Sequence, residues 1–360
     1  MHYGLVMECD YRYGHSIEEG FDEAFAIADL AEKGELDGVW LAERHFAAPK
    51  DPLDPMGGGI PSVVSTPLII CSAIAARTER LRIGVGVNVL PLIHPVRLAE
   101  EIATLDHISH GRVDFGIGRS GFMRAYEGYD IPYSESRERF QESLEIILAA
   151  WSNERFSYEG KYYTLNDVCV IPKPFQQPFP PLRMAATTKE TFPQVGKLGY
   201  PIFVGLRGLD RPDLVALLET YREAWREAGH AGNGDVYLRI PVYVGKTQEI
   251  AYAEAEASTM RSYRRMAQNF ALSAANPGAV ASEDRAARGA ALAAITYEDL
   301  IRDRLAYGSP DSVISQLKDI TSELGLSGIV AETNVGGLIP REQVAASIDL
   351  FCKEVVPGLR

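Results

Sequence analysis

Short apolar runs alternate with longer amphipathic stretches along the whole chain. The first run, 3–7, reads YGLVM, and residues 17–33 then place Phe21, Ala24 and Phe25 at helical spacing. The pattern predicts strands at 3–7, 38–41, 81–89, 113–118, 182–186, 201–204, 236–244 and 328–331. It predicts helices at 17–33, 66–77, 95–108, 134–151, 188–198, 212–228, 247–275, 310–324 and 340–352.

This alternation indicates an α/β fold. Strands that are apolar at nearly every position are typical of a parallel sheet covered by helices on both faces. Eight strand–helix units favour a closed (β/α)8 TIM barrel over an open sheet. The sequence shows no internal repeat of about 20–50 residues, which argues against a solenoid. We therefore expect a single domain, 1–360, with insertions near 43–64, 154–171 and 276–295.

Three segments interrupt the strand–helix rhythm. Residues 43–64 form a proline-rich loop that contains the run GGG at 57–59. Residues 156–171 read as a hairpin with its turn at 158–161. Residues 276–294 are rich in Ala, Gly and Ser, which predicts a mobile lid or an additional helix. Long loops in a compact fold are usually functional or disordered, so we expect the first and third segments to line the substrate pocket.

Composition narrows the class of protein. The chain is 46% hydrophobic, and its net charge is -13 with a pI near 5.1. No basic stripe is present that would neutralise phosphates, so no nucleic-acid partner is expected. The N-terminal sequence does not read as a signal peptide, and no run reaches the roughly 18–20 apolar residues that span a bilayer. The four cysteines are far apart, which argues against disulfides and a metal site. We expect a cytoplasmic enzyme.

Candidate chemistry follows from one property of such barrels: reactive groups gather at the C-terminal ends of the strands. Applied to this sequence, the rule selects residues after the second, third, fourth, fifth and eighth strands. They are Glu43, Arg44, His45 and Phe46; Gly86, Val87, Asn88 and His94; Gly118, Arg119, Ser120 and Gly121; Thr187 and Thr188; and Glu332, Thr333, Asn334, Gly336 and Gly337. His45 is the histidine that combines a strand end with a carboxylate and an aromatic neighbour, so it is a candidate general base.

Arg119, Arg137 and the two threonines suggest an anion site. Arg119 lies in a turn bracketed by glycines, and Arg137 opens the following helix. Thr187 and Thr188 precede another predicted helix, and guanidinium groups and helix-start amides both suit a phosphate. The alternative is that Arg119 forms a salt bridge while its flanking glycines only shape the turn. No GxGxxG motif opens a helix after a strand, so a Rossmann dinucleotide site is not supported.

Several ordered motifs connect the chain to a known family. They read VWLAERHF at 39–46, LPLIHPVR at 90–97, LDHISHGR at 105–112, FGIGR at 115–119 and YGSPDSV at 307–313. Their order and spacing resemble bacterial luciferase and its monooxygenase relatives. The resemblance spans essentially the whole chain and is strongest from 39 to 119.

The resemblance implies FMN, bound in its reduced form (FMNH2) at the barrel top, and O2, which adds to the flavin C4a as a peroxide. Glu43 would lie near the flavin ring, and the ring would rest on a cis peptide bond between Gly86 and Val87. Such a bond costs roughly 3–4 kcal/mol and needs support from its surroundings. The arginine and threonine set described above would hold the phosphate. A homodimer, formed through helices beside the first strands, is also implied.

Two positions depart from the luciferase pattern. Luciferase α subunits carry a His-His pair after the glutamate, and the first histidine is catalytic; here that position is Arg44. Arginine cannot act as a base at neutral pH, although it could hold an anionic substrate. The cysteine beside the phosphate-binding arginine is Gly118 here, which would open space next to the flavin. Both changes argue against light emission.

The resulting hypothesis is an FMNH2-dependent two-component monooxygenase that oxygenates a small organic substrate. A separate NAD(P)H:flavin reductase would supply FMNH2, because the chain has no nicotinamide-binding motif. His45, Arg44 and Glu43 are the candidate catalytic residues. Two alternatives stay open: a hydride-transfer enzyme that uses the deazaflavin F420, and a non-catalytic flavin-binding subunit.

Overall fold

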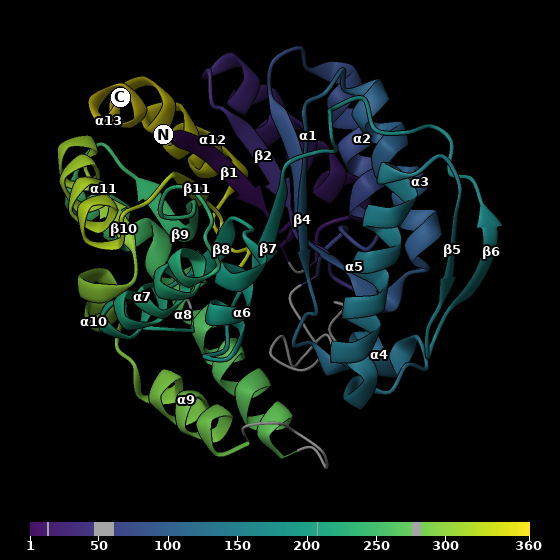
Figure 1. Ribbon diagram of the computed structural model, residues 1–360. Helices are drawn as coiled ribbons and strands as arrows, with labels where there is room; N and C mark the ends of the chain where they lie inside the picture. Colours follow the sequence, from purple (N-terminus) through teal and green to yellow (C-terminus); the bar gives the residue numbers. More distant parts are fainter. Residues whose placement is uncertain (13, 47–60, 207, 276–281) are drawn as a thin grey trace.

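Eight parallel strands form a closed barrel (Figure 1). The computed structural model describes residues 1–12, 14–46, 61–206, 208–275 and 282–360. The strands follow the ring order β1-β2-β3-β4-β7-β8-β9-β11, and β11 returns to β1. Their bounds are β1 (His2–Met7), β2 (Gly38–Leu41), β3 (Arg82–Val89), β4 (Val113–Gly118), β7 (Leu182–Ala185), β8 (Ile202–Gly205), β9 (Val236–Val244) and β11 (Gly328–Glu332). The predicted (β/α)8 barrel is confirmed.

Helices surround the ring and connect its strands (Figure 1). The major ones are α1 (Ile17–Lys33), α2 (Pro67–Arg77), α3 (Pro95–Ile108), α5 (Ser136–Ser152), α6 (Thr191–Leu198), α7 (Arg211–Glu227), α8 (Gln248–Ala274), α11 (Pro310–Leu324) and α12 (Arg341–Leu350). A π-helical turn (Phe351–Val355) continues α12 into α13 (Val356–Leu359). Each predicted helix is present, with ends shifted by a few residues. Periodicity shows which face of a helix is apolar but does not fix the residue at which the helix begins or ends.

Alternation along the strands separates two cores. Leu5, Val39 and Phe115 are fully buried in the larger core, where strands and helices meet. A second, smaller cluster comprises Val6, Trp40, Phe203, Tyr237 and Val330. Gly84 leaves room for this cluster, because a Cβ atom there would lie 2.7 Å from the Trp40 ring. Side chains therefore fill the barrel interior, and a site must lie at the strand ends.

Elements outside the repeat were only partly predicted. The hairpin is confirmed as antiparallel β5 (Phe156–Glu159) and β6 (Thr164–Val168), and α9 (Ser282–Ala294) confirms an additional helix. The elements α4 (Met123–Gly128), α10 (Tyr297–Asp303) and β10 (Ala306–Gly308) were not predicted. They span one or two turns or a few residues, which is too short for periodicity to reveal. β10 pairs with β9 outside the ring.

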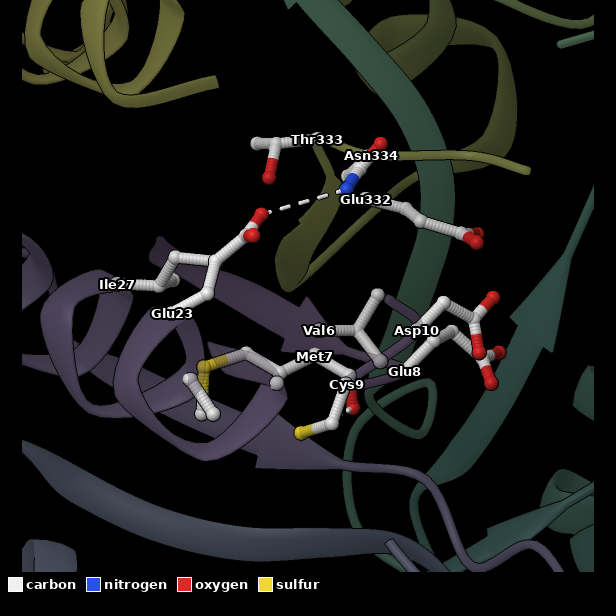
Figure 2. A pocket seen from close by; sticks show the side chains of 12 residues that line it. Val6, Met7, Glu8, Cys9, Asp10, Glu23, Ile27, Glu332, Thr333 and Asn334 are labelled. Carbon is white, nitrogen blue, oxygen red and sulfur yellow. Dashed lines mark hydrogen bonds between the residues drawn. The ribbon is translucent and has the colours of Figure 1, made fainter. Parts of the chain in front are cut away.

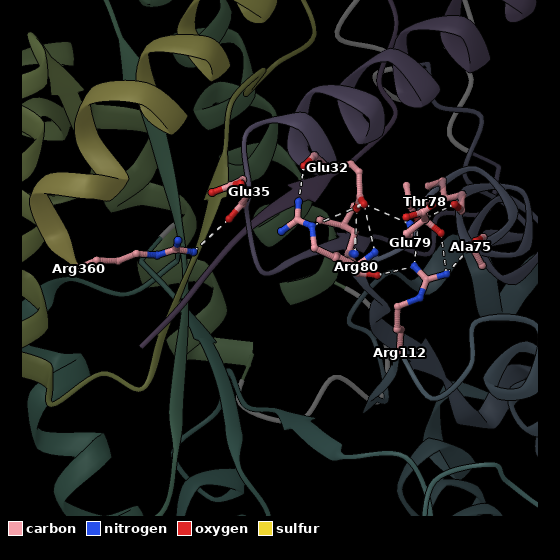
Figure 3. Close-up of polar contacts among 10 residues, drawn as sticks. Glu32, Glu35, Ala75, Thr78, Glu79, Arg80, Arg112 and Arg360 are labelled. Atoms are coloured by element: carbon pink, nitrogen blue, oxygen red, sulfur yellow. Dashed lines mark hydrogen bonds and ion pairs between the residues drawn. The ribbon is translucent and has the colours of Figure 1, made fainter.

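Polar contacts at the N-terminal end of the strands join helix ends to loops (Figure 3). Arg112 donates to the carbonyl oxygens of Ala75 and Thr78 and to the Thr78 hydroxyl. The Glu32 carboxylate accepts backbone N–H groups from residues 79–81. These bonds satisfy carbonyl groups left free at the end of α2 and tie α1 to the loop before β3. This end of the barrel serves stability.

Both chain termini lie at this same end, and α4 and α9 lie at the opposite end (Figure 1). The Tyr3 hydroxyl donates to the carbonyl of Leu359 at 3.1 Å, which joins the first strand to the last helix. All four cysteines are free thiols, as expected. Within the described ranges, no helix combines the length and the apolar composition needed to cross a bilayer.

Candidate active site

Four charged side chains pair with one another at the mouth of the barrel. Glu8, just after β1, accepts from Arg44, which follows β2, and from Arg239 on β9. Arg239 also pairs with Glu332, at the end of β11, at 2.8 Å. The side chains of Glu8 and Glu332 are only 5% and 3% exposed. Two carboxylates and two guanidinium groups thus compensate each other in a place shielded from water.

Arg44 is held on both sides. Nε of Arg44 pairs with the Glu8 carboxylate, and the guanidinium carbon of Arg44 lies 5.3 Å from the centre of the Phe122 ring. Burial favours the neutral form of Arg44, but the neighbouring Glu8 carboxylate outweighs it and raises the pKa of Arg44 above its usual value. Arg44 therefore stays charged, which agrees with the expectation that it cannot be a base.

Asp10 and Arg265 extend this charged group. Figure 2 shows the carboxylates of Glu8, Asp10 and Glu332 directed to one side of a small cavity beside β1, away from Glu23. Oδ1 of Asp10 and Nη1 of Arg265, on α8, are buried and have no hydrogen-bond partner in the described structure. Burial raises the pKa of Asp10 to about 7. Burial and the Arg44 charge lower the pKa of Arg265 to about 10.

A second chain of polar groups contains two of the predicted catalytic residues. One Glu43 oxygen lies 2.8 Å from Nε2 of His45, and the other accepts the backbone N–H of Val89 at 2.9 Å. The Tyr129 hydroxyl lies 3.1 Å from Nδ1 of His45, and burial raises the pKa of this tyrosine. The structure therefore brings Glu43 and His45 together and adds Tyr129, which sequence reasoning missed.

The peptide bond between Gly86 and Val87 is not cis. In the part of the chain that the structure describes, cis bonds precede Pro172 and Pro178 alone. The prediction is corrected: a register irregularity between Val85 and Asn88 turns the end of β3, so the chain changes direction with trans bonds. A Cβ atom at Gly86 would make only ordinary contacts, with the nearest atom at 3.7 Å, so the backbone there is not crowded.

Gly118 does not open free space, contrary to expectation. An added Cβ atom at Gly118 would lie 2.8 Å from a methyl carbon of Val87, so that side chain already occupies the place. Val87 from β3 and Gly118 from β4 thus pack together at neighbouring strand ends. The small residue accommodates a branched neighbour.

The predicted phosphate set lies around the ends of β4 and β7, which pair with each other. The Tyr126 hydroxyl donates to the carbonyl of Arg119, and its ring packs edge-on against Tyr133, close to Arg137 in sequence. Thr188 Oγ1 lies 2.9 Å from Oγ1 of Thr191, the first residue of α6. The side chains of Arg119 and Arg137 form no ion pair with any described residue.

The helix α9 reaches this set from the far side of the mouth. Arg288 donates to the carbonyl of Thr187 at 3.3 Å, and Arg285 donates to the Tyr133 hydroxyl at 3.3 Å. A groove between α8 and α9 is lined mostly by alanines. Of the predicted pocket loops, residues 47–60 and 276–281 lie outside the described residues.

Sequence reasoning missed several charged residues of the mouth. They are Glu8, Asp10, Arg239 and Arg265. Applying the strand-end rule to the first strand would have selected Glu8 and Asp10, and Arg239 is conspicuous as the charge within an apolar strand. Arg265 had no signal, because a helix with charged residues on several sides does not show which one faces the barrel.

Comparison with known sequences decides the family. A profile of the family described as luciferase-like monooxygenase matches residues 1–328. The chain belongs to this family. The prediction of a luciferase-like, flavin-dependent monooxygenase class of enzyme is thereby confirmed.

Curated relatives differ in how much of the chain they match. An uncharacterised protein of Sinorhizobium fredii is 32% identical over 178 residues, which cover 49% of this chain and 48% of that protein. The chain thus spans about half the length of that relative. The oxygenase component of flavin-dependent trigonelline monooxygenase from Acinetobacter baylyi is 25% identical over 65% of this chain and 62% of its own. The alkanal monooxygenase alpha chain of Photobacterium leiognathi is 23% identical over 96% of both chains.

Solved structures share the fold. The monooxygenase RslO1 of Streptomyces bottropensis has a TM-score of 0.81 at 24% identity and covers 100% of both chains. The oxygenating constituent of 3,6-diketocamphane monooxygenase from Pseudomonas putida, solved with FMN, has a TM-score of 0.79 at 21% identity, covering 100% and 99%. The coenzyme F420-dependent tetrahydromethanopterin reductase of Methanopyrus kandleri has a TM-score of 0.70 at 17% identity, covering 100% and 99%.

Proposed function

We propose that this chain is the oxygenase component of a two-component, FMNH2-dependent monooxygenase. One observation carries the cofactor assignment. Four arginines in or beside the barrel interior are paired with carboxylates: Arg44, Arg82, Arg183 and Arg239. Arg119 and Arg137 have no such partner within the described residues, and α9 bridges the segments near them by donating to the Tyr133 hydroxyl and to the Thr187 carbonyl. Two uncompensated guanidinium groups beside hydroxyls suit a phosphate dianion.

The remaining geometry fits the rest of FMN. The backbone at Gly86 is uncrowded, since an added Cβ would lie 3.9 Å from the Phe203 ring, and it would form the cradle for the flat flavin ring. The backbone at Gly86 and Val87 would support the flavin ring, and Glu43 follows the neighbouring strand β2. Arg119, Arg137, Thr187 and Thr188 would hold the phosphate.

Reduced FMN supplies the electrons with which O2 is activated. The chain itself positions groups and moves protons. A carboxylate only accepts hydrogen bonds, so the proton of neutral His45 lies on Nε2, which donates to Glu43. Nδ1 is then the acceptor for the Tyr129 hydroxyl. A proton removed from the substrate would go to the Tyr129 oxygen, while the hydroxyl proton of Tyr129 passes to Nδ1 of His45. The Glu8–Arg44 pair and the Phe122 ring cover one wall and exclude water.

The partners follow from the same proposal. FMNH2 must come from a separate NAD(P)H:flavin reductase, and O2 and a small organic substrate complete the reaction. The trigonelline and diketocamphane proteins are named as an oxygenase component and an oxygenating constituent, which supports a divided system. We also propose a homodimer formed through helices beside the first strands. The F420 alternative draws support from the shared fold of the F420-dependent reductase.

Cofactor binding and oxygen consumption test the proposal. The protein should bind FMN more tightly than riboflavin, since riboflavin lacks the phosphate. Arg119→Met and Arg137→Met should each weaken FMN binding by about 10- to 100-fold and leave riboflavin binding unchanged, as expected for a charged hydrogen bond. Arg97→Met, on the exposed surface of α3, is the matched control.

With FMNH2 and O2, a screen of organic substrates should yield an oxygenated product. Equal affinity for FMN and riboflavin would contradict the phosphate assignment. Anaerobic turnover with reduced F420 would replace the monooxygenase by the hydride-transfer enzyme. Hydrogen peroxide as the sole product, with every substrate tried, would also count against the proposal.

A further inference from the structure

The charges at the mouth do not cancel on the side of β1, β9 and β11. Arg44 and Arg239 are compensated by Glu8 and Glu332. Arg265 remains: it forms no ion pair with any described residue, and its Nη1 atom is buried without a hydrogen-bond partner. Arg265 is half-buried as a residue, but its Nη1 N–H groups are removed from water without an acceptor, which costs free energy unless a group from outside the chain accepts them.

Asp10 is an acid that could accept hydrogen bonds from Arg265, but it does not do so in this structure. Arg265 lies one turn after Arg261 on the same face of α8, and Arg261 donates to the Gly336 carbonyl in the loop after β11 at 3.1 Å. Asp10 and Arg265 also influence each other's ionisation, yet no ion pair or hydrogen bond joins them. Oδ1 of Asp10 is buried and also lacks a donor. A buried donor and a buried acid group thus face the same region with their hydrogen-bonding capacity unused.

This region lies across the mouth from the phosphate set. In the ring order, two strands (β2 and β3) lie between β1 and β4, and two strands (β8 and β9) lie between β7 and β11. The predicted phosphate set follows β4 and β7. The carboxylates of Glu8, Asp10 and Glu332 lie at the ends of β1 and β11. The mouth therefore carries two separate cationic places, and a cofactor phosphate held at one leaves the other free.

We propose that Arg265 binds a carboxylate group of the substrate, with Asp10 against the same group. The planar guanidinium fork matches a carboxylate, and a protonated Asp10 can donate to its second oxygen. The paired Arg44 and Arg239 enclose the site without competing, since Glu8 and Glu332 already occupy them. The inference rests on the proposed function and names its substrate class: a small organic acid that is oxygenated beside the flavin.

Small acids and their amides test the proposal without knowledge of the natural substrate. Formate, acetate and benzoate are titrated into the protein by calorimetry, each against formamide, acetamide and benzamide, with and without bound FMN. At least one acid should bind, and its amide should bind at least about tenfold more weakly, because the amide offers no charge to the guanidinium. In FMN-loaded protein the visible spectrum of the flavin should change on addition of that acid.

Arg265→Met should weaken binding of that acid by about 10- to 100-fold and leave FMN affinity unchanged. Arg264→Met is the matched control, because Arg264 neighbours Arg265 on α8 and is exposed. Arg265→Lys keeps the charge, should bind the acid with intermediate affinity, and serves if the methionine variant does not fold.

The proposal is overturned if no acid binds, if acids and amides bind alike, or if the Arg265 variants bind acids as the wild type does. A loss of FMN affinity in Arg265→Met would show that Arg265 binds the cofactor and not the substrate, which also overturns the proposal. Failure of the protein to bind FMN would defeat the proposed function alone, since the acid titration of the flavin-free protein stands independently.

Discussion

The carboxylate of Glu43 lies 2.8 Å from Nε2 of His45, and this contact fixes where the imidazole carries its proton. The backbone N–H of Val89 holds the other carboxylate oxygen, so the glutamate is anchored to the end of β3. In neutral His45, Nδ1 is then an acceptor, and the hydroxyl of Tyr129 at 3.1 Å is its donor. In the proposed mechanism, the candidate base named from the sequence would act through a tyrosine that the sequence did not reveal.

Tyr129→Phe tests this relay. Tyr129 is 45% exposed, so loss of its hydroxyl should change the stability of the fold little. It should lower the rate of product formation by about 10²-fold, the lower limit for positioned acid–base catalysis, with little change in substrate KM. Tyr162→Phe is the control, because Tyr162 lies between the strands of the outer hairpin and its hydroxyl donates to Glu138 of α5. Equal rates for the two variants would remove Tyr129 from the mechanism.

Two glycines on β3 should respond differently to added side chains. Gly86→Val should fold normally, because a Cβ atom finds its nearest neighbour at 3.7 Å, but its methyl groups should enter the cradle and weaken FMN binding more than tenfold. Gly84→Ala should instead lower the free energy of unfolding by about 1–3 kcal/mol, since its Cβ atom would overlap the Trp40 ring. Denaturant unfolding and flavin titration separate the two effects. Normal FMN binding by the valine variant would place the flavin elsewhere.

The barrel was predictable because its signals are local. Each strand is a short apolar run, and the alternation with helices repeats often enough to settle the class. Side-chain pairing was not predictable to the same degree. The strand-end rule found Glu43 and His45, yet the partner of Arg44 is Glu8 from a different strand, and only the pairing of β1 with β2 brings the two together.

The error at Gly86–Val87 has a physical cause of the same kind. A motif identifies the residues at a turn, but register with the neighbouring strand decides how the backbone makes it. The irregularity between β3 and β4 provides the change of direction here. Likewise, the space expected at Gly118 is filled by Val87, a contact between two strands that neither sequence segment encodes alone.

Arg112 should matter for stability and not for chemistry. Its guanidinium donates to two carbonyls and a hydroxyl at the end of α2, and to the carbonyl of Leu81 before β3 (Figure 3). Arg112→Met should lower the free energy of unfolding by about 3 kcal/mol, because several carbonyl groups lose their donor. FMN affinity should be unchanged. The exposed Arg77, paired with Asp29 on the surface, is the control, and its methionine variant should differ from the wild type by about 1 kcal/mol or less.

Asp10 should make the binding of organic acids depend on pH. Burial raises the pKa of Asp10 to about 7, so its carboxyl group is neutral in weakly acidic solution and ionised in alkaline solution. The groups that interact with its charge come from four elements: Glu8 after β1, Arg44 after β2, Glu332 on β11, and Arg261 and Arg265 on α8. The neutral form can donate to a bound carboxylate, whereas the ionised form repels it and competes for Arg265.

The affinity for the acid identified above should therefore fall by about tenfold or more as the pH rises from about 5.5 to about 8.5, with the midpoint near the pKa of Asp10. Asp10→Asn cannot ionise, so it should bind the acid with nearly constant affinity across this range. Calorimetric titrations at several pH values measure both proteins. A pH-dependence that persists in Asp10→Asn would assign the titration to another group, and affinity that rises with pH in the wild type would reverse the sign and exclude Asp10 from the site.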